Sequence, residues 1–198
     1  MSDFSQLEQQ FAFIIEIDRL KAVLRKNKPV TIDRYENTAE HSWQVALLAL
    51  TLTRHATEPV DTDKVIRMLL LHDLAEIDTG DAILYGDNHH GAEREQAERT
   101  AVQRIFGLLP DAQAATFFDI WQEFEDQRTP EARFAHAMDR LMPVLLNLAL
   151  GGQSWRENGV SKAQVLARAV SQVALGCPLA ADWLRDKLDS ADAAGFFG

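Results

Sequence analysis

Residues 65–76 read VIRMLLLHDLAE, an apolar helical run that ends in His72 and Asp73, with Glu76 three residues further on. Apolar residues on nearly every side are typical of a helix at the centre of a core. A His-Asp pair directly after four apolar residues is costly to bury unless other groups compensate its polarity. The stretch therefore predicts a central helix, at about residues 63–76, that carries a buried polar site.

Helical patterning continues on both sides of this stretch. Apolar residues recur at helical spacing over residues 4–24. Asn37, paired with Glu40 in a pattern that resembles a capping box, predicts the start of a helix that reaches about residue 55. Further helices are predicted over residues 92–108, 110–124, 130–150, 161–175 and 178–188, with a frayed tail over 193–198. With no strand candidate, internal repeat or interdomain linker, residues 1–198 are expected to form one all-α domain of about eight helices.

The composition fits a globular chain and excludes several classes of protein. The 198 residues include 20 Lys plus Arg and 30 Asp plus Glu, for a net charge of −10. This acidic balance argues against binding of nucleic acid polymers or anionic membranes, which need clustered cations. Cys177 is the only cysteine, so a disulfide framework is excluded. Without an apolar run of about 18 residues or a secretory signal pattern, the chain is expected to be cytoplasmic.

Four residues are candidates for a metal site. His41 lies in the predicted helix after Asn37, and Asp139 lies inside a long, mostly apolar helix. Together with His72 and Asp73 they offer two imidazoles and two carboxylates, a mixed set that suits Mn²⁺, Co²⁺, Fe²⁺, Ni²⁺ or Zn²⁺ better than Ca²⁺. Four protein ligands leave two positions of an octahedral ion for water and substrate, and water bound there is a usable nucleophile.

These segments resemble the HD-domain superfamily of metal-dependent phosphohydrolases, whose ordered signature is H…HD…D. The match is with its deoxynucleotidase branch and covers about residues 10–190. Residues 39–43 (AEHSW) are similar to the first motif of that branch. Residues 72–76, followed by Gly80-Asp81, are similar to its HDxxE…GD segment, and residues 134–141 to its third motif.

The resemblance implies an all-helical HD-domain bundle and one divalent ion, either one of the metals above or Mg²⁺. The ion would be held by His41, His72, Asp73 and Asp139. It also implies attack of metal-activated water on a small phosphate monoester, with nucleoside or deoxynucleoside 5′-monophosphates as the nearest known substrates. Glu76 would orient or deprotonate that water, and Asp81 would contact the sugar or the leaving oxygen. Helical spacing agrees for Glu76, which shares a face with His72 and Asp73.

A basic cluster supplies a candidate for binding the phosphate. Five cations lie within ten positions: Arg19, Lys21, Arg25, Lys26 and Lys28. The resemblance points to Arg25, whose planar fork matches two phosphate oxygens. The deoxynucleotidase relatives carry a Trp close after this Arg, whereas this chain has Lys26 next to it. That departure leaves the choice between ribose and deoxyribose open.

Other interpretations remain open from the sequence. The enzyme could hydrolyse another phosphorylated metabolite, and a non-catalytic nucleotide-sensing module or a purely structural metal is the alternative to an enzyme. His89 and His90 lie in a polar stretch, where a flap over the site is favoured over a second metal site. His136 is a candidate for supporting Asp139. Trp155 could line a pocket or a subunit contact, and aromatic residues in amphipathic helices are compatible with a homodimer.

Overall fold

The computed structural model describes residues 3–85 and 91–198. Within these ranges the chain is helical, apart from loops and an isolated antiparallel bridge between Leu24 and Asn37, so the predicted all-α fold is confirmed. The helices are α1 (Asp3–Ile17), α2 (Thr38–Leu52), α3 (Thr62–Leu71), α4 (Glu76–Thr79), α5 (Ala92–Phe106), α6 (Asp111–Asp126), α7 (Pro130–Ala149), α8 (Gln153–Glu157), α9 (Lys162–Val165), α10 (Ser171–Gly176) and α11 (Pro178–Ala193). None of the described helices is both long and apolar enough to cross a membrane.

Side-chain caps set the starts of the three helices that meet at the centre of the molecule. Asn37 caps α2 in a capping box with Glu40, as predicted. Asp61 accepts a hydrogen bond from the first turn of α3. Thr129 does the same for α7, with Pro130 at the first helical position. These caps satisfy backbone N–H groups that would otherwise lack partners, and they fix where each helix begins.

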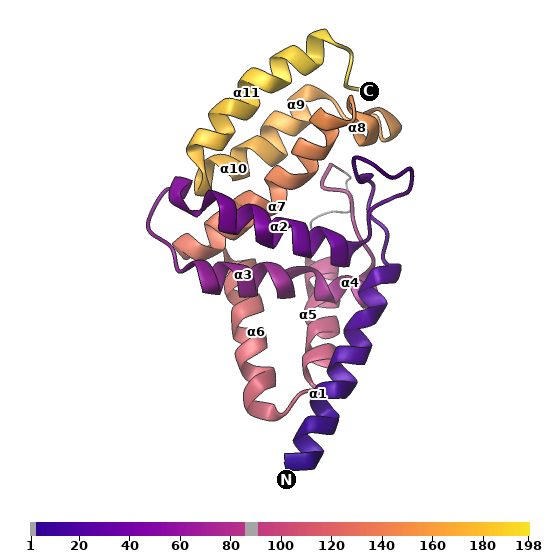
Figure 1. The fold of residues 1–198 in the computed structure, drawn as a ribbon, viewed down its shortest axis with the longest axis vertical. Coiled ribbons are helices and arrows are strands. Elements are labelled where there is room, and N and C mark those ends of the chain that lie inside the picture. Colours follow the sequence, from indigo (N-terminus) through magenta and orange to yellow (C-terminus); the bar gives the residue numbers. More distant parts are fainter. Residues whose placement is uncertain (1–2, 86–90) are drawn as a thin grey trace.

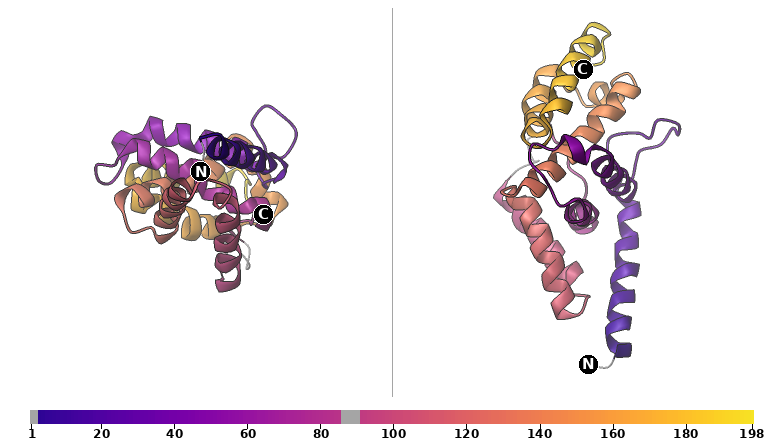
Figure 2. Two further views of the ribbon diagram at one scale, coloured as in Figure 1. Left: turned by 90° about the horizontal axis from the view of Figure 1, so that it is seen from below. Right: turned by 60° about the vertical axis from the view of Figure 1, so that its left-hand side comes forward.

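The helices are arranged in two groups around this centre. Helices α2, α3 and α7 cross in the middle, α9, α10 and α11 lie at one end, and α1, α5 and α6 extend towards the other (Figures 1 and 2). One apolar core, which includes Met68, Phe134 and Met138, joins α3 and α7 to the C-terminal helices. A second core, which includes Ile105 and Trp121, packs α5 and α6. The polar site lies where α2, α3 and α7 meet.

The predicted central helix differs from the structure in two respects. It is divided, because α3 ends at Leu71 and a 3₁₀ turn over His72–Ala75 leads into α4. It is also not buried on every side, since Leu69 is fully buried but Leu70 is 50% exposed. In a 3₁₀ turn, residues three apart are aligned along one face. The turn therefore places Asp73 and Glu76 in line.

The prediction of a frayed C-terminal tail was wrong. The ring of Phe197 stacks on Trp155 with centroids 4.7 Å apart, and the backbone N–H of Gly198 donates to the carbonyl of Val160. Gly152 allows this packing, because it has a φ of 77° and an added Cβ would lie 1.9 Å from the carbonyl oxygen of Phe196. Trp155, on the unpredicted helix α8, is therefore a core residue and not the wall of a pocket.

Candidate active site

Three separate elements bring the predicted metal-binding side chains together. His41 comes from α2, His72 and Asp73 from the 3₁₀ turn after α3, and Asp139 from α7. Their candidate ligand atoms all lie within 4.8 Å of one another. His41 Nε2 is 2.9 Å from Asp139 Oδ1, and His72 Nε2 is 3.1 Å from Asp73 Oδ2. The structure thus gathers four ionisable groups around one point.

The two histidine rings both direct Nε2 at this point. His72 Nδ1 lies 2.9 Å from the carbonyl oxygen of Leu69, and a carbonyl only accepts, so Nδ1 carries the proton. That leaves His72 Nε2 buried and without a hydrogen-bond partner among the described residues. Buried polar atoms of this kind are uncommon because they cost free energy. An imidazole held through Nδ1, with Nε2 free, is the usual arrangement of a metal ligand.

The electrostatics also suit a divalent cation. Burial would raise the pKa of Asp139, but Arg140 and the two imidazoles outweigh burial and hold that pKa well below its usual value. Burial, with help from the Arg25 charge, lowers the pKa of His41 to about 4, so this ring is neutral at pH 7. Burial would lower the pKa of His72 as well, but Asp73 and Asp139 raise it well above its usual value. The imidazole of His72 therefore tends to be protonated on both nitrogens when no metal is bound. A metal that binds Nε2 must displace the proton there, so metal binding is expected to weaken as the pH falls.

Glu76 and Asp81 lie beside this group. Glu76 accepts a hydrogen bond of 2.8 Å from the Thr38 hydroxyl, and burial together with the Asp73 charge raises its pKa well above the usual value. Gly80 ends α4 with a φ of 72°, a conformation that favours glycine. The turn brings Asp81 Oδ1 to 3.5 Å from Arg25 Nη1.

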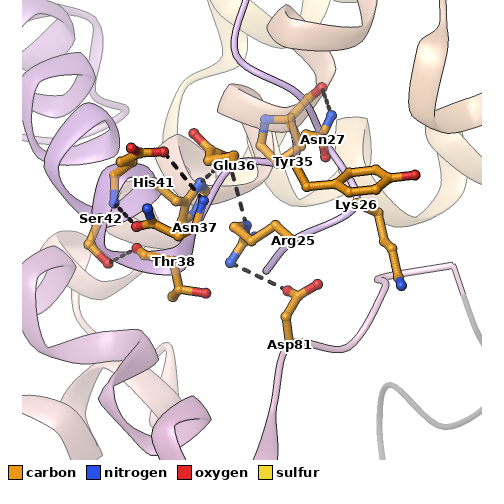
Figure 3. Close-up of polar contacts among 12 residues, drawn as sticks. Arg25, Lys26, Asn27, Tyr35, Glu36, Asn37, Thr38, His41, Ser42 and Asp81 are labelled. Atoms are coloured by element: carbon orange, nitrogen blue, oxygen red, sulfur yellow. Dashed lines mark hydrogen bonds and ion pairs between the residues drawn. The ribbon is translucent and has the colours of Figure 1, made fainter. Parts of the chain in front are cut away.

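Arg25 is the only member of the basic cluster with a described contact to the carboxylates of Asp73, Glu76 and Asp81. Its Nη1 donates to Asp73 Oδ2 at 2.9 Å, and its side chain is almost buried. Burial opposes its charge, but the surrounding carboxylates keep its pKa above the usual value. Figure 3 shows the Arg25 side chain between Glu36 and Asp81. The other four cations of the cluster have no described contact to the four candidate ligands.

A cavity of about 640 Å³ opens onto the site. Its lining includes Arg25, Glu76 and Asp81, together with residues of α5 and α6 such as Arg94 and Gln122. The size is that of a small-molecule site. A substrate in this cavity would contact the metal-binding group, the predicted base and the guanidinium at the same time.

Residues 17–180 match the sequence profile of the family described as HD domain. This chain belongs to the HD-domain family. The crystal structure of a predicted metal-dependent phosphohydrolase from Magnetospirillum magnetotacticum MS-1 superposes with a TM-score of 0.90 and 41% identity, over 98% of this chain and 96% of that one. The predicted family and the predicted enzyme class, a hydrolase, are confirmed.

Curated relatives are named as deoxynucleotidases. The protein named 5′-deoxynucleotidase HDDC2 of Danio rerio is 29% identical over 140 residues, which are 70% of this chain and 68% of the relative. The protein named 5′-deoxynucleotidase YfbR of Escherichia coli is 26% identical over 156 residues, 74% of this chain and 78% of the relative. The match to the Xenopus laevis HDDC2 protein, at 32% identity, spans 55% of that relative.

Two residues of this HD-domain site were missed by sequence reasoning. Glu36 falls in the polar segment interpreted as a loop, yet it is only 2% exposed and lies 3.8 Å from His41 Nδ1. Thr38 was seen only as a helix start, but its hydroxyl binds Glu76. No local pattern marks either residue, because the bridge between Leu24 and Asn37 is what folds this segment over the site.

Three further histidines were considered from the sequence: His136, His89 and His90. His136 Nε2 donates to the carbonyl of Phe124 and its ring stacks on that residue with centroids 3.8 Å apart. Burial lowers its pKa to about 3, so it is a neutral packing residue next to the site and not one of the gathered four. His89 and His90 lie outside the described residues.

Proposed function

We propose that this protein is a divalent-metal-dependent phosphohydrolase whose substrate is a nucleoside or deoxynucleoside 5′-monophosphate. The observation that carries the proposal is the convergence of His41, His72, Asp73 and Asp139, of which His72, Asp73 and Asp139 line a cavity of about 640 Å³. Four buried or nearly buried carboxylates, those of Glu36, Asp73, Glu76 and Asp81, lie within 4.0 Å of the Arg25 guanidinium, and Asp139 lies beside Arg140. Carboxylates thus outnumber guanidinium groups around the site, an excess of negative charge that favours a bound cation. The substrate class is supported by the names of the relatives.

The chemistry follows from the residues around the cavity. The four gathered residues would hold a divalent ion, which when bound would act as a Lewis acid on the phosphoryl group and lower the pKa of water. Glu76 accepts the proton of the attacking water as the new P–O bond forms, and its raised pKa suits it to that task. The ester P–O bond breaks, and the leaving oxygen takes up the proton that Glu76 accepted from water. Arg25 neutralises charge on the phosphoryl oxygens, and Asp81 contacts the sugar or the leaving oxygen.

Phosphate release from a panel of ribo- and deoxyribonucleoside 5′-monophosphates tests this function. The protein is stripped of metal, and Mn²⁺, Co²⁺, Ni²⁺, Zn²⁺ or Mg²⁺ is added back singly, with Asp73→Ala as the control. We expect release that depends on at least one of these ions and is absent from the control. Tight nucleotide binding without release under any ion would instead indicate a sensor. Release from sugar phosphates but not from nucleotides would indicate a different metabolite.

Arg25→Ala is expected to lower kcat/KM by about 10- to 100-fold, the value of a hydrogen bond to a charged group. The loss appears in KM if Arg25 holds the phosphate equally before and during the reaction, and in kcat if the contact tightens in the transition state. Lys21→Ala is the matched control, because Lys21 belongs to the same cluster but pairs on the surface with Asp18. Steady-state kinetics with metal-saturated protein measure both, and an unchanged kcat/KM removes Arg25 from the site.

We also propose that two copies of this chain associate through exposed apolar side chains. Trp43, Leu47 and Leu50 lie at helical spacing on α2 and are 62%, 44% and 55% exposed, and α1 exposes Phe11 and Ile15. Large exposed apolar patches mark contact sites, and a two-fold interface uses the same patch on both copies. Light scattering is expected to give twice the chain mass of 22.2 kDa. Leu47→Glu should give the monomer mass, and a wild-type monomer contradicts the proposal.

A further inference from the structure

Glu36 is a buried carboxylate that faces the charged guanidinium of Arg25 and the neutral imidazole of His41. Its Oε2 has no hydrogen-bond partner among the described residues. The same oxygen lies 3.8 Å from His41 Nδ1 and 4.0 Å from Arg25 Nε (Figure 3). His41 Nδ1 is also buried and has no hydrogen-bond partner in the described part of the chain. Two complementary buried groups that lack partners therefore face each other.

The backbone holds Glu36 in this position from both sides. Its N–H donates to the carbonyl of Asn27 at 2.9 Å, and its carbonyl accepts from the N–H of Arg25, also at 2.9 Å. The next residue, Asn37, caps α2, and His41 follows within the first turn of that helix. The carboxylate is thus fixed between the strand-like segment that carries Arg25 and the helix that carries His41.

The two histidines of the site differ in the hydrogen bonding of Nδ1, the ring nitrogen that faces away from the gathered residues. His72 donates its Nδ1 proton to the carbonyl of Leu69. A neutral imidazole that offers Nε2 to a metal must carry its proton on Nδ1, so His41 needs an acceptor as well. Glu36 is the carboxylate that faces Nδ1. The terminal torsion of a glutamate is broad, so a modest rotation of the carboxylate closes the gap.

We propose that Glu36 is a positioning residue that accepts the Nδ1 proton of His41 and faces Arg25 Nε with the same oxygen. It thereby commits His41 Nε2 to the metal and ties the metal site to the phosphate-binding guanidinium. This inference rests on the proposed function, because it assigns His41 to a metal and Arg25 to a phosphate. Carboxylates behind a metal-bound imidazole typically raise metal affinity by about 10- to 100-fold.

Cobalt binding to Glu36→Gln tests the inference with a readout other than activity. Gln keeps the shape of the side chain but removes its charge, and Glu36→Leu removes the acceptor as well. Glu40→Gln is the matched control, since it makes the same charge change four residues away, where Glu40 pairs with Arg34 on the surface. A glutamine at this position also preserves the capping box of α2. Circular dichroism and thermal melting establish that each variant is folded.

The affinity for Co²⁺ is measured by visible absorption against a competing chelator. We expect it to fall by about 10-fold in Glu36→Gln, by up to about 100-fold in Glu36→Leu and not in Glu40→Gln. Long-range ¹⁵N–¹H spectra of the wild type should place the His41 proton on Nδ1, and KM should rise in Glu36→Gln because Arg25 loses its neighbour. Wild-type affinity in both Glu36 variants would overturn the inference and leave the metal site standing. Failure of the wild type to bind Co²⁺ would overturn both.

Discussion

Asp73→Ala and Asp139→Ala are each expected to lose bound metal and phosphatase turnover together. Each carboxylate lies within 4.8 Å of the other candidate ligand atoms, and each contributes charge that offsets the buried cation. Removing one carboxylate leaves only three candidate ligands, and it leaves a buried imidazole without the carboxylate beside it. A metal ion contributes several kcal/mol to the stabilisation of a phosphoryl transition state, so turnover should fall about 1,000-fold or more. Elemental analysis of the purified variants and phosphate release measure the two effects.

Another carboxylate that lines the same cavity provides the control for these variants. Asp126 lines the cavity but accepts a hydrogen bond from Gln122 and lies outside the gathered group. Asp126→Ala should therefore retain metal and turn over at close to the wild-type rate. Retention of metal by both Asp73→Ala and Asp139→Ala would show that these aspartates do not hold it.

Glu76→Gln is expected to retain the metal and lose turnover by about 100- to 10,000-fold, the usual contribution of a positioned general base. The amide has nearly the same shape and can still accept the hydrogen bond from Thr38, but it cannot take a proton from water. Metal content and melting temperature should match the wild type. The loss should therefore appear in kcat, since substrate binding does not require the base.

A smaller change on the same hydrogen bond refines this assignment. Thr38→Val removes the hydroxyl that donates to Glu76 and keeps the side-chain volume, so it should lower kcat much less than Glu76→Gln does. Full turnover in Glu76→Gln with metal in place would assign the proton transfer to another group.

Sequence patterns predicted the parts of the fold that depend on local interactions. The capping box of Asn37 and Glu40 acts within one helical turn, and it is observed where the sequence placed it. The packed tail escaped prediction because Phe197 finds its partner, Trp155, by tertiary contact. The 3₁₀ turn at His72 escaped it too, since helical spacing does not distinguish a tightened turn from a continuous helix.

The candidate site shows the same division between local and distant information. His72, Asp73 and Glu76 stand in one motif, so their proximity was predictable. His41 and Asp139 are 98 positions apart. They were grouped with that motif as polar residues inside apolar helices, and the resemblance to a family supported the grouping, but no spacing rule links them. Glu36 carried no signal at all, because its burial depends on the bridge between Leu24 and Asn37.

The separation of 98 positions between His41 and Asp139 has a consequence for folding. Closing so large a loop costs chain entropy that local helix formation does not repay. The helices should therefore form well before α2 docks on α7, and the metal site should be among the last features to assemble. A ligand that binds only the completed arrangement stabilises it by mass action. A metal ion bound to the four gathered residues would thus have a second effect, since it would hold closed the longest loop between them.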